Sequence, residues 1–137
     1  MKKVTAFPLA GHLLSTTGGN LVMAEWTAEG CTEGAEPMKI APLHIHREDD
    51  EAWYVLEGTL AFRIDDQTVE ANAGDAVMVP RGAAHTYWNP KAESARYLLI
   101  MTVRISELIE AIHAAPDRSP EGLRKLFEKY ETEFIGW

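Results

Sequence analysis

Residues 44–58 read HIHREDDEAWYVLEG, with two histidines one residue apart, four consecutive acids and then an apolar run. Successive side chains point to opposite faces of an extended strand, so His44 and His46 would place both imidazoles on one face. Imidazole is the commonest metal ligand in proteins, and a carboxylate is a natural oxygen partner beside it. The segment therefore predicts a metal-binding strand with a carboxylate close by.

A second segment, residues 74–89, reads GDAVMVPRGAAHTYWN. Together the two segments resemble the paired motifs of the cupin family. The first motif is H-x-H, three or four residues, E, six residues, G, and it fits His44, His46, Glu51 and Gly58. The second motif is G, five residues, P-x-G, two residues, H, three residues, N, and it fits Gly74, Pro80, Gly82, His85 and Asn89. The resemblance covers about residues 10–103 in motif and layout.

This resemblance implies a mainly β fold, a double-stranded β-helix (jelly-roll cupin barrel), with a metal inside and a homodimeric assembly. It also implies one divalent transition metal per chain, with the ligands His44, His46, Glu51 and His85. A donor set of three nitrogens and one oxygen suits iron, manganese, nickel, zinc, cobalt and copper alike, so it does not identify the metal. The alternative is that these histidines are ordinary buried polar residues of a barrel wall.

The run of four acids requires a choice of carboxylate ligand. Only Glu51 is separated from Gly58 by six residues, and only Glu51 begins the apolar strand that would carry its side chain inward. The other three acids, residues 48–50, are expected to form a solvated turn.

The chain is predicted to form one cupin domain over residues 1–137, with a barrel core at about 10–103. A first strand is expected at residues 4–7. A regular strand over residues 38–46 would place Met38, Ile40, His44 and His46 on one face, although Pro42 suggests an edge or a bend.

After the barrel the hydrophobic period changes from two to 3.6. One apolar stripe is typical of an amphipathic helix, and Ser119-Pro120 is a helix start with serine as N-cap. A second stripe extends to Phe134. The tail, about residues 105–135, is therefore predicted to be two helices that pack on the barrel or on a neighbour and leave the metal site unaffected. The two stripes are Ile105, Leu108, Ile109 and Ile112, then Leu123, Leu126, Phe127, Tyr130 and Phe134.

Four side chains are candidates for contact with a small-molecule ligand. Trp53 is two residues from Glu51 and Tyr87 is two residues from His85, so each shares a strand face with a proposed metal ligand. Met38 and Ile40 are expected nearby. Small barrels also need bulky side chains to fill them, so core packing is the alternative for all four.

Composition narrows the function classes. The chain has 137 residues, and 13 Lys+Arg against 21 Asp+Glu give a net charge of −8 without a basic stripe, which disfavours nucleic acid as a partner. The single cysteine, Cys31, cannot form an internal disulfide. Pro8 and Gly11 interrupt the segment where a signal peptide would be apolar, and the longest apolar run is too short for a bilayer. We expect a cytoplasmic protein that does not contact membranes.

The resemblance does not supply a substrate, because this fold hosts many activities. Our first hypothesis is a metal-dependent, dioxygenase-like enzyme that acts on a small aromatic or enolisable oxygenated compound, as in short bacterial cupins described as quercetin-dioxygenase-like. The second is a non-enzymatic, metal-containing module that binds or senses a small ligand. The third is a metal-assisted isomerase or lyase.

Overall fold

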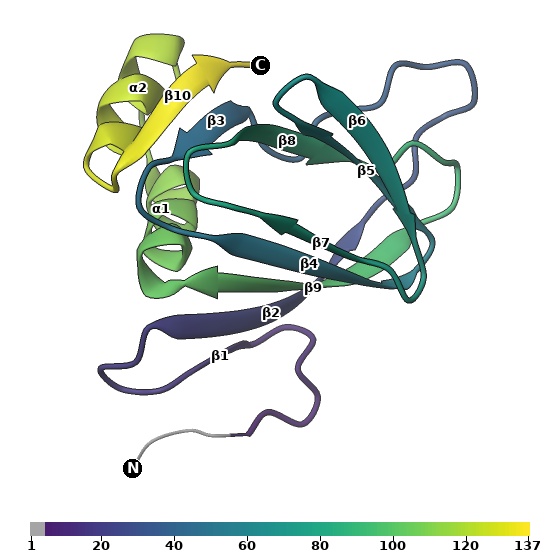
Figure 1. The fold of residues 1–137 in the computed structure, drawn as a ribbon, viewed down its shortest axis with the longest axis horizontal. Helices are drawn as coiled ribbons and strands as arrows, with labels where there is room; N and C mark the ends of the chain where they lie inside the picture. Colours follow the sequence, from purple (N-terminus) through teal and green to yellow (C-terminus); the bar gives the residue numbers. More distant parts are fainter. Residues whose placement is uncertain (1–4) are drawn as a thin grey trace.

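The computed structural model describes residues 5–137, which form ten strands and two helices (Figure 1). The strands lie in two five-stranded antiparallel sheets, one ordered β1-β2-β9-β4-β7 and the other β10-β3-β8-β5-β6. The fold is mainly β and consistent with a double-stranded β-helix, so the predicted fold class is confirmed. The strands are β1 (Leu13–Ser15), β2 (Leu21–Ala28), β3 (Leu43–His46), β4 (Glu51–Glu57), β5 (Thr59–Ile64), β6 (Gln67–Asn72), β7 (Ala76–Val79), β8 (Ala84–Trp88), β9 (Ala95–Thr102) and β10 (Thr132–Gly136), and the helices are α1 (Val103–Ala114) and α2 (Pro120–Glu128).

The hydrophobic core lies between the two sheets, and strict alternation along the strands builds it. In β4 the side chains of Glu51, Trp53 and Val55 are buried, whereas Tyr54 is 37% exposed on the opposite face. The same alternation buries every second residue of β9. A period of two over seven or eight residues therefore decides which side chains reach the interior. The outward face of β4 is open in a single chain at Tyr54.

Two motif residues have structural explanations. Gly58 has φ of 77° in the turn between β4 and β5, and an added Cβ would lie 2.6 Å from the Ser94 carbonyl oxygen, so only glycine fits. Asn89 is buried, and its side-chain amide donates to the carbonyl oxygens of Ala28 and Glu93. Both residues hold the loops that precede β9 in place, and these contacts explain their presence in the motifs without a role in catalysis.

The structure differs from two predicted strands, one at residues 4–7 and one at residues 38–46. For the strand predicted at residues 4–7, residue 4 lies outside the described residues, and residues 5–7 are not a strand. The strand expected from residue 38 begins only at Leu43, because Pro42 lacks the N–H that a sheet ladder requires. Met38 is consequently 87% exposed and does not share the face of His44.

The tail forms the two predicted helices and one strand that was not predicted. Thr102 and Ser119 cap α1 and α2, each accepting a hydrogen bond from a backbone N–H three residues on. The second helix ends at Glu128 rather than near residue 135. Glu131 then adopts φ of 53°, which reverses the chain into β10. Phe134 thus belongs to a strand, and the prediction of a purely helical tail is wrong.

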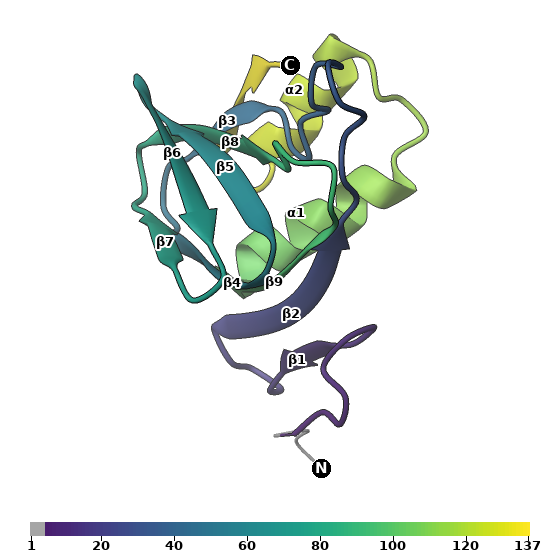
Figure 2. The same ribbon diagram turned by 90° about the vertical axis from the view of Figure 1, so that its right-hand side faces the viewer.

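Strand β10 joins the barrel itself, because it pairs antiparallel with β3 at the edge of the second sheet. Figures 1 and 2 show β10 and both helices gathered at one end of the barrel, beside β3. The tail therefore lies against the strand that carries His44 and His46. None of the described helices is long and apolar enough to span a membrane.

Candidate metal centre

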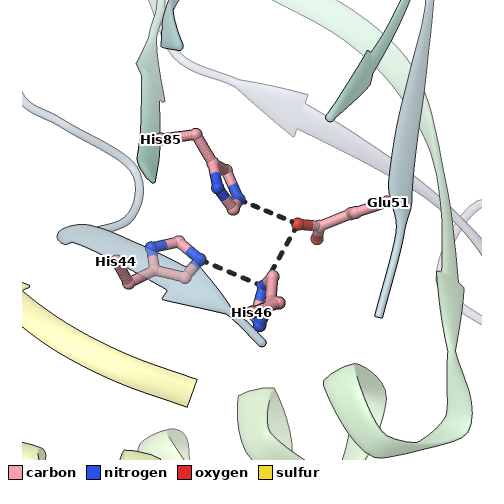
Figure 3. A group of neighbouring side chains, drawn as sticks. All are labelled: His44, His46, Glu51 and His85. Atoms are coloured by element: carbon pink, nitrogen blue, oxygen red, sulfur yellow. Dashed lines mark hydrogen bonds and ion pairs between the residues drawn. The ribbon is translucent and has the colours of Figure 1, made fainter. Parts of the chain in front are cut away.

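Four side chains from three strands and both sheets converge at the β10 end of the barrel (Figure 3). His44 and His46 lie on β3, and His85 lies on the neighbouring β8, directly opposite His44 in the antiparallel register. Directly paired residues project to the same face, so the three imidazoles lie on one face of the sheet that contains β3 and β8. Glu51 is the first residue of β4 in the other sheet. A ligand held by all four would link the two sheets.

The donor atoms lie at distances typical of ligands that share one ion. Nε2 of His44 is 3.1 Å from Nε2 of His46, and Oε1 of Glu51 is 3.3 Å from His46 Nε2 and 3.1 Å from His85 Nε2. One donor atom from each residue lies within 4.8 Å of the others, and all four residues are buried. Adjacent donors around an ion with bonds of about 2.1 Å are roughly 3.0–3.4 Å apart. The cluster could therefore hold a metal ion.

Each imidazole also has an oxygen acceptor at its other nitrogen. Nδ1 of His44 donates to the carbonyl oxygen of Pro42, and Nδ1 of His85 lies 3.2 Å from the carbonyl oxygen of Ala83. Nδ1 of His46 lies 2.9 Å from Oγ1 of Thr132. Oxygen partners at all three Nδ1 atoms favour the tautomer with the proton on Nδ1, which leaves every Nε2 with a free lone pair.

This arrangement is electrostatically unbalanced without a cation. The facing Nε2 atoms of His44 and His46 present two lone pairs to each other, and both lie near the carboxylate of Glu51. Such a contact is repulsive unless a proton or a metal ion lies between the donors. A divalent cation would satisfy three lone pairs and one negative charge together, so the residues present fit a metal ion.

The pKa values reflect the same buried environment. Burial, followed by the neighbouring imidazoles of His85 and His46, lowers the pKa of His44 from 6.5 to about 3. Burial raises the pKa of Glu51, but the interaction of its carboxylate with His46 and His85 in their protonated form outweighs burial and lowers the Glu51 pKa to about 2. The glutamate is thus an anion at neutral pH, as a metal-binding carboxylate must be.

The acidic segment before Glu51 is not entirely the solvated turn that we expected. Asp49 is only 8% exposed, and its Oδ2 lies 3.5 Å from Nη1 of Arg104 in α1. Asp50 is exposed but accepts a hydrogen bond from the backbone N–H of Arg81. An anchored loop holds its geometry better than a free one, so these acids fix the connection between β3 and β4.

A cavity of about 390 Å³ opens beside the cluster, which is within the range of small-molecule sites. Its walls include His44, His46 and Glu51 but are mainly apolar and aromatic. Of the four candidates for ligand contact, Trp53, Tyr87 and Ile40 line it, whereas Met38 does not. The helices and the C-terminus also contribute, with lining residues that sequence reasoning missed: Ile105, Leu108, Ile109, Ile112, His113, Leu123, Phe127 and Trp137.

The two candidate aromatic side chains serve the core and the cavity at once. Trp53 is 1% exposed, and its ring packs edge-on against Tyr87 with 5.2 Å between centroids. The hydroxyl of Tyr87 lies 2.9 Å from that of Tyr97, which also lines the cavity. Burial raises the pKa of Tyr97 to about 12 and that of Tyr87 well above 10, so both remain protonated. Two hydroxyl protons and one mutual hydrogen bond leave one proton free to donate.

The chain matches the family described as "Cupin domain" over residues 33–101, which is half of its length. The fold, the paired motifs and this match show that the chain belongs to the cupin family. Among curated proteins, none matches the chain.

Solved structures give the same assignment of the fold. A cupin protein from Bacteroides fragilis is 18% identical with a TM-score of 0.58, and the match covers 74% of this chain and 86% of that protein. A protein from Thermus thermophilus is 22% identical with a TM-score of 0.52, over 61% of this chain and 72% of that one. A protein described as a putative sugar phosphate isomerase, from Acidithiobacillus ferrooxidans, is 24% identical with a TM-score of 0.52, over 61% of this chain and 51% of that one.

Proposed function

We propose that this cupin is a metal-dependent, dioxygenase-like enzyme that acts on a small, largely apolar compound with metal-coordinating oxygens. One observation carries the proposal: the three Nε2 lone pairs and the Glu51 carboxylate converge at the wall of a mainly apolar cavity of about 390 Å³. A structural metal site is closed by protein ligands, whereas a catalytic site retains an open position.

A bound divalent ion would polarise a substrate oxygen as a Lewis acid and, if redox-active, would allow chemistry with dioxygen. The protein's own residues supply the rest. The apolar walls exclude water and strengthen the electrostatic interactions of the substrate. The remaining hydroxyl proton of the Tyr87–Tyr97 pair offers one hydrogen bond to a substrate acceptor. This combination favours an aromatic or enolisable ligand.

The cavity walls argue against a phosphorylated sugar, the substrate type named for the Acidithiobacillus protein. Among the described residues that line the cavity, none is lysine or arginine, and Glu51 carries a negative charge. Apart from the proposed metal ion and the imidazole of His113, the cavity offers no positive partner for a phosphate dianion, whose burial would therefore be costly. An isomerase or lyase that acts on an uncharged hydroxy-ketone or diketone remains an outcome of the test below.

Oxygen uptake tests the proposal. Protein loaded separately with iron(II), manganese(II) and nickel(II) should consume dioxygen in the presence of at least one compound in a panel of phenols and diketones. The His85→Ala variant should not, because it lacks a donor atom of the cluster. Saturable binding without uptake or product would indicate a ligand-binding module, and conversion of a panel compound without oxygen uptake would indicate an isomerase or lyase.

We also propose that the protein is a homodimer through the outward face of the first sheet. Met23, Ile100, Ala52 and Met78 lie side by side across β2, β9, β4 and β7, and Met78 is 69% exposed. An apolar row on an open sheet face is typical of a surface that another chain covers. Sedimentation should show a dimer, and Met78→Glu should shift it toward monomer, whereas the exposed Val69→Glu on β6 of the other sheet should not.

A further inference from the structure

The C-terminal strand contributes to the candidate metal centre through its register. In the pairing of β10 with β3, Thr132 lies directly opposite His46, and Phe134 lies directly opposite His44. Residues opposite each other in an antiparallel pair project to the same face, so both tail residues face the barrel interior beside the imidazoles. Thr132 is fully buried and Phe134 is 4% exposed.

The hydroxyl of Thr132 has a defined direction. Oγ1 lies 3.0 Å from the carbonyl oxygen of Tyr130, and that oxygen can only accept. The hydroxyl therefore donates its single proton to Tyr130 and has lone pairs left for the ring of His46. Nδ1 of His46, 2.9 Å away, must then be the donor. The proton of this imidazole is on Nδ1, and Nε2 is free to bind a cation.

This differs from the support of the other two histidines. His44 and His85 each donate to a backbone carbonyl two residues earlier on the same chain segment, namely Pro42 and Ala83. His46 alone relies on a side chain, and that side chain comes from 86 residues away. The acceptor of His46 can therefore be removed by one substitution, whereas those of the other two cannot.

The turn that leads into β10 is itself tied to the residue after His46. The backbone N–H of Arg47 donates to the carbonyl oxygen of Glu131, at 2.9 Å. The guanidinium of Arg47 pairs with the carboxylate of Glu128 at the end of α2, at 2.7 Å. The end of β3 and the start of β10 thus form one connected unit, which keeps Thr132 in place.

We propose that Thr132 is a positioning residue that fixes the tautomer and orientation of His46, and that the C-terminal strand is in this way part of the metal centre. The inference rests on the metal binding proposed above. It predicts that loss of the hydroxyl leaves the Nδ1 proton of His46 buried without an acceptor, which favours other tautomers and ring orientations. Partners of this kind typically change metal affinity by about 10–100-fold.

The test compares Thr132→Val, which keeps the shape but removes the hydroxyl, with Thr132→Ser, which retains it. A matched control is Thr59→Val, because Thr59 is also a buried strand threonine whose hydroxyl makes a side-chain hydrogen bond, to Asn72, away from the cluster. Zinc and cobalt affinities are measured by competition with a chelator. We expect Thr132→Val to bind about 10–100-fold more weakly, with Thr132→Ser and Thr59→Val close to the original protein.

A second readout needs no metal and no variant. Nitrogen-15 NMR of the metal-free protein should show His46 with its proton on Nδ1 and a bare Nε2. The proposal is overturned if His46 carries its proton on Nε2, if Thr132→Val binds zinc as tightly as the original protein, or if Thr59→Val weakens binding equally. Failure of the original protein to bind zinc or cobalt at all would instead overturn the proposed metal function, so the two failures are distinguishable.

Discussion

Thr132 and His46 are 86 residues apart in the chain, yet Oγ1 of one lies 2.9 Å from Nδ1 of the other. The contact joins the last strand of the molecule to a candidate metal ligand near its middle. It exists because β10 pairs with β3 in a register that places the two residues opposite each other. The tail is therefore structurally part of the site.

Removal of residues 132–137 should weaken metal binding. The deletion takes away β10, leaves the β3 edge unpaired and removes the acceptor of His46. From sequence alone we expected a tail truncation to spare the site, and the structure predicts the opposite. We expect a loss of at least about tenfold in zinc affinity for the soluble, folded fraction, as judged by circular dichroism.

The matched control deletes only residues 135–137, which retains Thr132 and Phe134. This shorter deletion should leave zinc affinity nearly unchanged, although Trp137 at the cavity wall is lost. Equal zinc affinities for the two truncated proteins would mean that β10 has no effect on the centre.

The stability of the metal-free protein should fall on mild acidification, mainly through His44. Its pKa is about 3 in the fold against the usual 6.5, so between these values the unfolded chain binds the extra proton and the folded one does not. Stability from this group is therefore complete above about pH 6.5 and is lost progressively toward pH 3. Glu51, with a pKa lowered to about 2, adds a loss only below about pH 4.5.

Urea unfolding with a chelator present, at about pH 7 and about pH 5, measures this effect. In His44→Asn the side chain retains an N–H for the Pro42 carbonyl but does not titrate. The free energy of unfolding of this variant should therefore depend less on pH than that of the original protein. The difference between the two slopes should be up to about 1.4 kcal/mol per pH unit. His12→Asn, at an exposed histidine, should behave like the original protein. A pH dependence in His44→Asn as steep as in the original protein would contradict the account.

Trp53 should affect large ligands more than small ones. Its ring forms part of the cavity wall between the cluster and Tyr87, so Trp53→Phe enlarges the space available to a ring-shaped ligand. In cobalt-loaded protein we expect the affinity for catechol to change several-fold and that for azide to change little. Spectral titration of both ligands measures this difference. Equal effects on the two ligands would assign Trp53 to the core alone.

The candidate metal centre could be predicted from the sequence because much of the information that defines it is local. His44, His46 and Glu51 stand within eight positions, and a period of two is enough to place them on inward faces. Placing His85 beside them required the family resemblance, because its pairing with His44 joins strands that are distant in the chain. The double-stranded β-helix was likewise implied by the family resemblance rather than by the alternation alone.

The errors arose where tertiary context outweighs local pattern. Tyr130 and Phe134 continue the helical spacing of Leu123 and Phe127, but the left-handed backbone at Glu131 ends that periodicity and starts a strand. In β10, buried Thr132 and Phe134 alternate with exposed Glu133 and Ile135. A strand of five residues is too short for this alternation to be recognised from the sequence. Nothing in a sequence read without the fold links Thr132 to His46.

Metal binding at this centre is tested most directly by a cobalt(II) titration of the metal-free protein, followed by its visible absorption. We expect a signal that saturates at about one equivalent per chain and shifts on addition of catechol or acetylacetone, because the four donors lie beside an open cavity. His46→Ala and His85→Ala should abolish or greatly weaken it, and His12→Ala should leave it unchanged. A protein that shows no saturable cobalt signal, or one that His46→Ala and His85→Ala leave intact, would contradict the account.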